Sequence, residues 1–368
     1  MRLAVVGCGH LGRIHARLAA ARESIDLVAI VDPVAAARQA VAADLGIEAC
    51  SDISQLAGRV DAAIIAAPTA WHHALGLELL ASGVHLLIEK PLAMNVAEAD
   101  ELVAAANGAG CVLQVGHVER FNPALSAAGG KLSDPKYIEA RRYSGYTFRS
   151  TDIGVVLDLM IHDLDIILSI ARSEVVEVDA LGVAVMGEHE DAATARLKFA
   201  NGCVANLSAS RISFERARQM QIWSAERFAA LNFDDGTAKI VEPTECLTSG
   251  TFAGDALSPN EKASIRDSLF QTHLPMEEFS APEVNAIAEE HADFQAAVEM
   301  GFTPRVSGQA GRDAVAVAER ILSAIESHAW DGHRGGRIGP RRLAGEPVVR
   351  GPHWHLGEHA PANRREAG

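Results

Sequence analysis

The feature that most constrains the fold is a short glycine-rich stretch near the amino terminus. Gly7-Cys8-Gly9-His10-Leu11-Gly12 fits the pattern G-x-G-x-x-G, and it joins the apolar run LAVVG to the helix-period run IHARLAAAR. In that setting the first glycine permits a tight turn, the second lets the backbone approach a pyrophosphate, and the third lets the helix pack against the strand. The amino terminus of the helix then faces the phosphates. We therefore expect a dinucleotide to be bound here by Gly7, Gly9, His10, Leu11 and Gly12.

A carboxylate at the end of the next apolar run refines this prediction. Asp32 follows DLVAIV about 20 residues after the last glycine, where a carboxylate accepts hydrogen bonds from the adenosine ribose. This charge repels a 2′-phosphate, and the next residue, Pro33, offers no cation to hold one. NAD is therefore favoured over NADP. The alternative is a carboxylate that only caps the following helix.

The first third of the chain alternates between short apolar runs and segments with helical periodicity. The apolar runs are LAVVG, DLVAIVD, DAAIIAAP, VHLLIEKP and CVLQVGHV. Nearly continuous apolar runs separated by helices are typical of a parallel sheet that is covered on both faces. We expect an α/β fold in which residues 1–120 form a doubly wound Rossmann domain.

From about Tyr137 the apolar pattern changes to longer segments with a period of two. Turns at Ala200-Asn201-Gly202 and Asp234-Asp235-Gly236 indicate hairpins. Residues 121–330 are therefore expected to form a substrate-binding and oligomerisation domain: an open, mostly antiparallel sheet with helices on one face. Its open face suits a homo-dimer or homo-tetramer, and two late helices complete the globule. Residues 331–368, rich in Gly, Pro, Arg and His, are expected to form a disordered tail.

Charge and composition exclude several classes of partner. The formal net charge of −15 repels a nucleic-acid backbone. No apolar run approaches the ~20 residues of a membrane helix, and the first residues lack the regions of a signal peptide, so a cytoplasmic protein without membrane contact is expected. The five cysteines are scattered without CxxC spacing, which predicts neither disulfides nor a metal site.

Glu89-Lys90-Pro91 is the first motif that indicates chemistry rather than binding alone. It follows the apolar run VHLLI, so it stands at the carboxyl end of the predicted sheet, where doubly wound domains hold ligands. A lysine at this position can hydrogen-bond a reacting hydroxyl group. The sequence therefore predicts that Lys90 lies beside the reacting atoms.

Together with the glycine loop, this motif resembles the glucose-fructose oxidoreductase/inositol dehydrogenase family. The resemblance runs from Met1 to about Ser327. Further matching motifs are Ala67-Pro68-Thr69 with His72, Gly116-His117 followed by Glu119-Arg120-Phe121-Asn122-Pro123, and Pro304-Arg305-Val306-Ser307-Gly308. The resemblance implies an oxidoreductase that exchanges hydride between a sugar hydroxyl carbon and the nicotinamide.

The resemblance also implies which residues act in catalysis. In that family a helix of the second domain presents Asp-x-x-x-His toward the nicotinamide, and the match here is Asp158 with His162. His162 would be the general acid/base, and Lys90 would steady the oxygen while hydride moves. The i, i+4 spacing places Asp158 on the same helical face, where it orients the imidazole or touches the substrate. The alternative is a solvated helix face whose charges pair with one another.

Further site residues follow from the same resemblance. The nicotinamide side of the cofactor would be lined by Pro68, Thr69, His72, Glu89, Lys90 and His117. Asn122 is expected either to hold sugar hydroxyls or to close an Asx turn before Pro123, and the two readings have equal weight.

An arginine-rich run ahead of the Asp-x-x-x-His motif bears on the substrate. RRYSGYTFR, which ends at Arg149, is basic in an otherwise acidic chain, and arginine binds a diphosphate bidentately. A sheet edge kept soluble by charge is the alternative. The run from Arg149 into the motif looks like the branch of the family that oxidises UDP-N-acetylglucosamine at its 3-hydroxyl. A free-sugar or cyclitol dehydrogenase and a non-catalytic NAD-binding sensor are the other hypotheses.

Overall fold

The computed structural model describes residues 1–148, 150–282 and 284–328. The predicted tail at 331–368 lies outside these ranges. Among the helices of the described residues, none is both long and apolar enough to cross a lipid bilayer.

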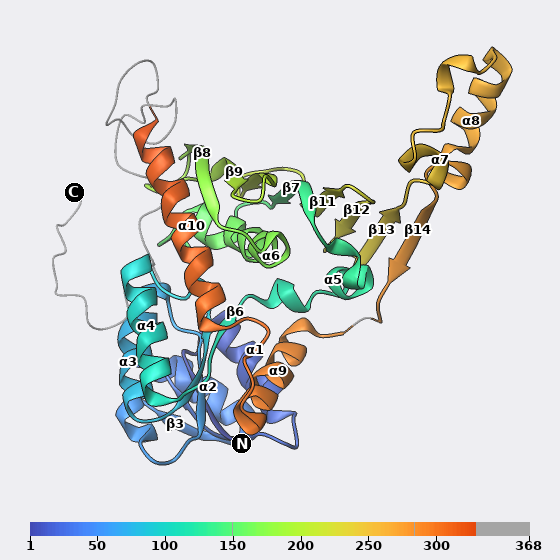
Figure 1. The fold of residues 1–368 in the computed structure, drawn as a ribbon. Helices are drawn as coiled ribbons and strands as arrows, with labels where there is room; N and C mark the ends of the chain where they lie inside the picture. The colour runs from blue at the N-terminus through green and yellow to red at the C-terminus, as the bar shows by residue number, and fades with distance from the viewer. Residues whose placement is uncertain (149, 283, 329–368) are drawn as a thin grey trace.

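The amino-terminal domain is built on a six-stranded parallel sheet with the order β3-β2-β1-β4-β5-β6 (Figure 1). Its strands are β1 (Arg2–Val6), β2 (Asp26–Val31), β3 (Glu48–Cys50), β4 (Ala62–Ile65), β5 (His85–Glu89) and β6 (Leu113–Gly116). The connecting elements are α1 (His10–Ala20), α2 (Ala35–Leu45), η1 (Ile53–Leu56), η2 (Thr69–Trp71), α3 (His72–Ala81) and α4 (Val96–Ala109). Strands β1, β4, β5 and β6 are buried along nearly their whole length because helices cover both faces. The strand order is that of a Rossmann fold, as predicted.

The second domain is an eight-stranded sheet with the order β14-β13-β12-β11-β7-β10-β9-β8. Its strands are β7 (Pro135–Tyr143), β8 (Val175–Val183), β9 (Ala192–Phe199), β10 (Val204–Ser210), β11 (Ala217–Ser224), β12 (Phe228–Asn232), β13 (Thr237–Val241) and β14 (Met276–Ser280). Only the β7–β10 pair is parallel among the described strands of this sheet. The predicted class, a Rossmann domain followed by a mostly antiparallel sheet, is therefore confirmed.

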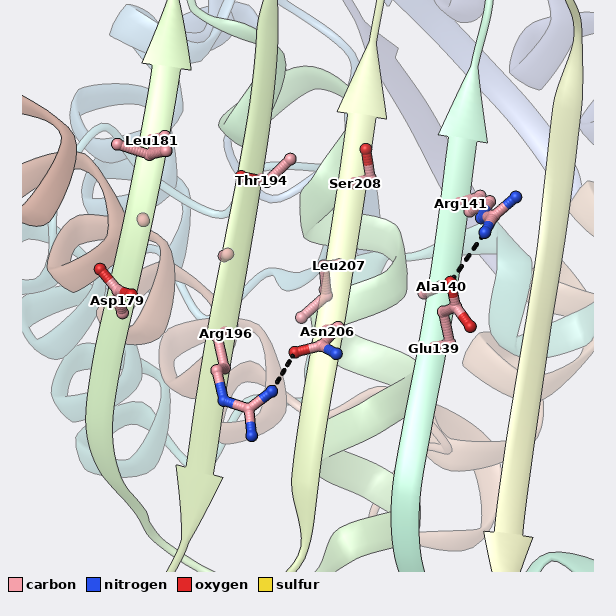
Figure 2. A pocket seen from close by; sticks show the side chains of 12 residues that line it. Glu139, Ala140, Arg141, Asp179, Leu181, Thr194, Arg196, Asn206, Leu207 and Ser208 are labelled. Carbon is pink, nitrogen blue, oxygen red and sulfur yellow. Dashed lines mark hydrogen bonds and ion pairs between the residues drawn. The ribbon is translucent and has the colours of Figure 1, made fainter.

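One face of this second sheet is buried and the other is open. Along β9 and β10 the side chains alternate between buried and more exposed positions, as the period of two predicts. Figure 2 shows the open face across β8, β9, β10 and β7, where Arg196 bonds Asn206 at 3.1 Å and Arg141 bonds Glu139 at 2.8 Å. The closed face is covered by α6 (Ile161–Ala171) and α10 (Gly308–Ser327). Short elements link the two sheets: η3 (Val118–Phe121), α5 (Pro123–Ala128) and η4 (Gly129–Leu132). The π-helical turn η5 (Val156–Met160) stands between β7 and α6.

The two late helices return to the first domain. The helix α9 (Ala286–Met300) packs on α1, and its Phe294 is 1% exposed within the core that β1 and β2 build. In α10, an added Cβ at Gly308 would lie 2.6 Å from Leu113, and one at Gly311 would lie 2.4 Å from Val115, so this helix sits directly on β6. A division of the chain at residue 120 therefore leaves out part of the amino-terminal domain. Helical periodicity revealed an apolar face on each helix but not the surface that the face would meet.

An arm between β13 and β14 was not predicted from the sequence. It contains α7 (Glu245–Thr248), η6 (Gly254–Ala256) and α8 (Pro259–Thr272), and Figure 1 shows it projecting from the second domain. No residue of α8 is buried. The start of α8 has a local signal that sequence reading passed over: Ser258 and Glu261 form a capping box around Pro259.

Candidate active site

The carboxyl edge of the parallel sheet gathers the predicted cofactor residues. Because all six strands run in the same direction, the segments that follow them meet along one edge. The predicted residues placed there are Gly7, Asp32, Pro68, Thr69, Glu89, Lys90 and His117. The edge thus forms one continuous site from segments that are far apart in the sequence.

The glycine loop has the geometry that a pyrophosphate requires. Gly7 has a φ of +100°, and an added Cβ would lie 2.6 Å from the carbonyl oxygen of Ala66. At Gly12 an added Cβ would lie 1.9 Å from the carbonyl oxygen of Gly7, whereas at the exposed Gly9 it would meet nothing within 4 Å. No side chain caps the amino terminus of α1, and its first residues, His10 and Leu11, are exposed. The free N–H groups of α1 therefore face open space beside Gly9, which suits a phosphate group.

We expect Gly9→Ala to lose affinity for NAD and Gly12→Ala to lose stability. The Gly9 variant keeps its fold, because the added methyl meets no protein atom, but it raises the Kd for NAD about tenfold or more by occupying the space of the pyrophosphate. The Gly12 variant loses about 1–3 kcal/mol of stability, because helix and strand must move apart. Thermal unfolding and NAD titration of both variants test the pair. Equal NAD affinity in wild type and Gly9→Ala would contradict a cofactor at this loop.

Asp32 supports the loop and remains available to a ribose. Its carboxylate accepts hydrogen bonds from the N–H groups of Cys8 at 2.7 Å and Val34 at 2.8 Å. The side chain is only partly buried. The carboxylate therefore binds the backbone just ahead of the following helix, and its contact with a ribose stays a prediction.

Lys90 makes a contact that joins the two domains. Its Nζ donates to the carbonyl oxygen of Asp158 at 2.7 Å and to the Asp158 carboxylate at 3.0 Å. The two side chains are only 13% and 18% exposed, so water weakens this ion pair little. Asp158 lies in the π-helical turn η5, which widens the chain just before α6. The prediction that Asp158 orients His162 needs correction, because the hydrogen bonds found for its carboxylate among the described residues go to Lys90.

The imidazole of His162 has a ring nitrogen that is not used in a hydrogen bond within the described residues. Its Nδ1 is buried and has no hydrogen-bond partner among the described residues, while the side chain as a whole is partly exposed. Burial, together with the positive charges of Lys90 and Arg142, holds the pKa of His162 well below its ordinary value. The imidazole is therefore neutral near neutral pH and able to accept a proton. This is the protonation state that a base for alcohol oxidation needs.

Several predicted cofactor residues prove to be wholly or almost wholly buried, among them Thr69, which is 6% exposed. His72 is 1% exposed, and its ring nitrogens contact the carbonyl oxygens of Pro91 at 2.9 Å and Ala67 at 2.8 Å. Glu89 is 7% exposed and contacts His15. His72 therefore holds the turn after Lys90 and has no ring nitrogen left for the cofactor, which corrects its predicted role.

His117 is 0% exposed, and neither of its ring nitrogens has a partner among the described residues. Its ring meets the ring of His162 edge to face at a centroid distance of 6.0 Å. Burial, with Lys90 and Arg120 nearby, lowers the pKa of His117 to about 3. Buried polar groups usually have hydrogen-bond partners, so the two unpaired nitrogens of His117 mark a position beside His162 where a polar group can be bound.

Asn122 and Arg149 were predicted to bind the substrate, and the structure bears on only the first of them. Asn122 accepts a hydrogen bond from the N–H of Ala124 at 3.0 Å and donates to Glu119 at 2.9 Å and to the carbonyl oxygen of Phe233 at 3.0 Å. The Asx turn is therefore correct, and the expected contact of Asn122 with sugar hydroxyls is wrong, because its amide is already in use. Arg149 lies outside the described residues.

A buried ionic network beneath His162 was missed by sequence reasoning. Arg142 is 3% exposed and bonds Asp163 and Glu119, each at 2.7 Å. Arg120 pairs with Asp165 at 3.3 Å, and burial raises the pKa of Asp165 to about 6. The alternative of a solvated, self-paired helix face is therefore wrong. The available signal was the apolar character of this helix, since carboxylates on a buried face need cationic partners.

Comparison with known proteins assigns the chain to a family. Residues 1–117 match the model of an oxidoreductase family with an NAD-binding Rossmann fold, and residues 127–227 match the model of the GFO/IDH/MocA C-terminal domain. The chain belongs to the Gfo/Idh/MocA family of oxidoreductases, and its cofactor is NAD.

Individual relatives cover most of the chain. A UDP-N-acetylglucosamine 3-dehydrogenase of Acidithiobacillus ferrooxidans is 37% identical over 89% of this chain and 98% of its own length. A solved structure of that enzyme superimposes with a TM-score of 0.76 over 89% of this chain and 98% of that chain, at 36% identity. A scyllo-inositol 2-dehydrogenase (NAD(+)) of Bacillus subtilis is 29% identical over 58% of this chain and 68% of its own length.

Proposed function

We propose that the protein is a sugar dehydrogenase that oxidises a secondary hydroxyl of a nucleotide-linked amino sugar, UDP-N-acetylglucosamine at its 3-hydroxyl. The observation that carries this proposal is the placement of Lys90, Asp158 and the neutral His162 around one point beside the dinucleotide loop. The extent of the similarity to the Acidithiobacillus enzyme supports this substrate. Similarity to the inositol dehydrogenase supports a free cyclitol as the second candidate.

The residues of the site divide the chemistry between them. When bound, NAD supplies the hydride acceptor at the nicotinamide. The ammonium group of Lys90 donates a hydrogen bond to the reacting hydroxyl oxygen, while Asp158 fixes the position and charge of that ammonium. His162 accepts the hydroxyl proton, because its imidazole is neutral near neutral pH. The alcohol loses a proton to the protein and a hydride to the cofactor, which leaves a ketone.

A substrate panel tests the proposal. The purified chain is mixed with NAD and, separately, with UDP-N-acetylglucosamine, UDP-glucose, myo-inositol or glucose, each with a carbonyl trap that draws the reaction forward. We expect reduced nicotinamide absorbance with the acetylated UDP-sugar alone. A signal with myo-inositol or glucose alone would shift the assignment to the second candidate. NAD binding without turnover of any substrate would favour a non-catalytic sensor.

Arg149 is proposed to bind the diphosphate of the substrate. Charge-assisted hydrogen bonds of this kind contribute about 1.5–3 kcal/mol each, so Arg149→Ala is expected to raise KM for the UDP-sugar at least about tenfold. Steady-state kinetics measures the change, with Arg266→Ala on the exposed helix α8 as the control. An unchanged KM in the Arg149 variant would remove this residue from the substrate site.

The pH dependence of the reaction is expected to reflect the lowered pKa of His162. An imidazole with the ordinary pKa of 6.5 would lose its base form, and the rate of oxidation would fall, as the pH drops through that value. Because burial and two cations lower the pKa, this acid limb should lie well below pH 6.5. A profile of kcat/KM against pH locates it. An acid limb centred near pH 6.5 that disappears in His162→Gln would contradict the neutral state assigned to His162.

We also infer that the open face of the second sheet mediates self-association into a homo-dimer or homo-tetramer. Side chains of both charge signs lie across it, including Asp179, Glu139, Arg141 and Arg196, which gives a self-complementary surface (Figure 2). Light scattering measures the oligomeric state of wild type and of the Arg196→Glu variant, and a difference between the two tests the role of this sheet face in self-association. A cytoplasmic location stays a prediction.

A further inference from the structure

A buried cluster of titratable side chains lies behind Lys90 and has no part in the proposed chemistry. His15 on α1, Glu89 at the end of β5 and Glu290 on α9 each place one nitrogen or oxygen atom within 4.8 Å of the others. His15 and Glu290 are 0% exposed and Glu89 is 7% exposed. Three segments of the fold thus converge on one point inside the amino-terminal domain.

One carboxyl group of the cluster has no partner in the described part of the protein around it. Glu89 accepts from the N–H of Lys90 at 3.1 Å and contacts the Nε2 of His15 at 2.7 Å. Neither carboxylate oxygen of Glu290 has a hydrogen-bond partner among the described residues. A buried carboxylate without a partner is costly, and a cation bound in the cluster would compensate for it.

Other polar groups around the cluster do not supply this charge. The side chain of Gln114 donates to the backbone carbonyl oxygen of Glu290, not to its carboxylate, at 3.0 Å. The guanidinium of Arg22 donates to the carbonyl oxygen of Ala288 at 3.3 Å. The carboxyl group of Glu290 is therefore without a partner among the described residues at the position between His15, Glu89 and Glu290, where a cation would fit.

We propose that this cluster binds one divalent transition-metal cation, of which Zn²⁺ is the best match, through the Nε2 of His15 and one carboxylate oxygen each of Glu89 and Glu290. Imidazole and carboxylate are Zn²⁺ ligands at about 2.0–2.2 Å, and a tetrahedral ion places its ligand atoms about 3.4 Å apart. The ligand atoms need shift only slightly to reach such an ion, since all lie within 4.8 Å of one another. The three protein ligands leave the fourth position for water.

The surroundings of His15 match those of a metal-binding histidine. Its second nitrogen, Nδ1, contacts the Nε2 of His291 at 2.8 Å, and the two rings stack with their centroids 5.1 Å apart. Metal-binding histidines are usually held by such a hydrogen bond from the other ring nitrogen, which sets the tautomer and the ring orientation. His291 thus contacts the ring nitrogen of His15 that does not face Glu89.

The proposed ion would tie α9 to the catalytic edge. Glu290 and His291 belong to the returning helix, whereas Glu89 precedes Lys90 directly and binds its backbone N–H. The ion therefore acts as a structural and positioning element behind the catalytic lysine. It takes no part in hydride transfer, so its presence does not depend on the substrate proposed above.

Metal content and thermal stability of the full-length chain test this inference. Wild type, Glu290→Gln and the control Glu289→Gln, an exposed neighbour on the same helix, are stripped with chelator and dialysed against Zn²⁺. Histidines of the carboxyl-terminal tail are present in all three proteins, so adventitious binding there cancels in the comparison. Wild type and Glu289→Gln are expected to hold one equivalent more than Glu290→Gln. Zn²⁺ should raise their Tm by about 5 °C and leave that of Glu290→Gln unchanged.

Equal metal content in the three proteins, or no response of the wild-type Tm to Zn²⁺, would overturn the proposal. Stability of stripped Glu290→Gln equal to that of wild type would then indicate that Glu290 carries a proton instead. If Glu290→Gln does not fold, Co²⁺ bound to the wild-type chain provides the test. A visible spectrum typical of four-coordinate Co²⁺, displaced by one equivalent of Zn²⁺, supports the site, and a spectrum of hydrated Co²⁺ alone excludes it.

Discussion

Replacing Lys90 by alanine is expected to lower kcat about a thousandfold while leaving the affinity for NAD within a few-fold of wild type. In the proposed reaction the ammonium group stabilises the reacting oxygen as its proton leaves, and a positioned proton donor or acceptor contributes about 10²–10⁴-fold to such reactions. The same substitution leaves the partly buried carboxylate of Asp158 without its cation, which disturbs the cleft further. The rate of nicotinamide reduction with UDP-N-acetylglucosamine, or with the substrate that the panel identifies, provides the measurement.

Two further variants test whether the loss of activity is specific to the lysine side chain at position 90. Lys131→Ala removes a lysine that pairs with Glu242 away from the cleft, and it should retain wild-type kcat. Lys90→Arg keeps the positive charge but holds its proton too tightly and in a different geometry, so it should bind NAD normally and remain strongly impaired. A Lys90→Ala enzyme with kcat within tenfold of wild type would show that this lysine only holds the two domains together.

Replacing Arg142 by leucine is expected to cost about 3–5 kcal/mol of stability. The substitution leaves two carboxylates, Asp163 and Glu119, without their shared cation in the protein interior, and breaking a buried ion pair in this way carries a cost of that size. Arg218 lies 3.6 Å from Glu119 but is 40% exposed, so it compensates only in part. The midpoint of urea unfolding, followed by circular dichroism, provides the measurement.

Arg17 offers a control in a surface ion pair. It pairs with Asp44 at 2.9 Å, and its side chain is 65% exposed, so Arg17→Leu should change stability by less than about 1 kcal/mol. Similar losses in the two variants would mean that the buried network contributes no more than a surface pair. Because Asp163 follows His162 directly, a destabilised network should also lower activity in Arg142→Leu at temperatures where the protein remains folded.

Local pattern was sufficient for much of the molecule. The glycine loop could be predicted because the local backbone requires glycine at these positions. Gly7 has a φ of +100°, and the backbone at Gly12 packs closely against the carbonyl oxygen of Gly7. The parallel strands and the hairpins of the second sheet followed from apolar periodicity and turn residues, with Gly202 at a φ of 85° and Gly236 at 70°. These features depend on residues close to one another in the chain. Sequence alone therefore predicted the fold class, a parallel Rossmann sheet followed by a mostly antiparallel sheet.

Contacts between residues that lie far apart in the sequence could not be predicted from such patterns. Spacing suggested that Asp158 serves His162, whereas folding places it against Lys90. The sequence predicted equally that the Asn122 amide binds a sugar or closes its own turn. The hydrogen bonds of this amide with the backbone of Phe233 and Ala124 favour the turn.

The sequence by itself determined most strands and helices of the two domains and which residues stand at the carboxyl edge of the parallel sheet, because both depend on local backbone and apolar requirements. Only the tertiary structure decided which polar groups are buried together, as in the ion pair of Arg142 with Asp163 and the contact of His15 with a histidine 276 residues away. The cost of burying a polar group, and therefore the choice of its partner, is set by the packing of the whole chain.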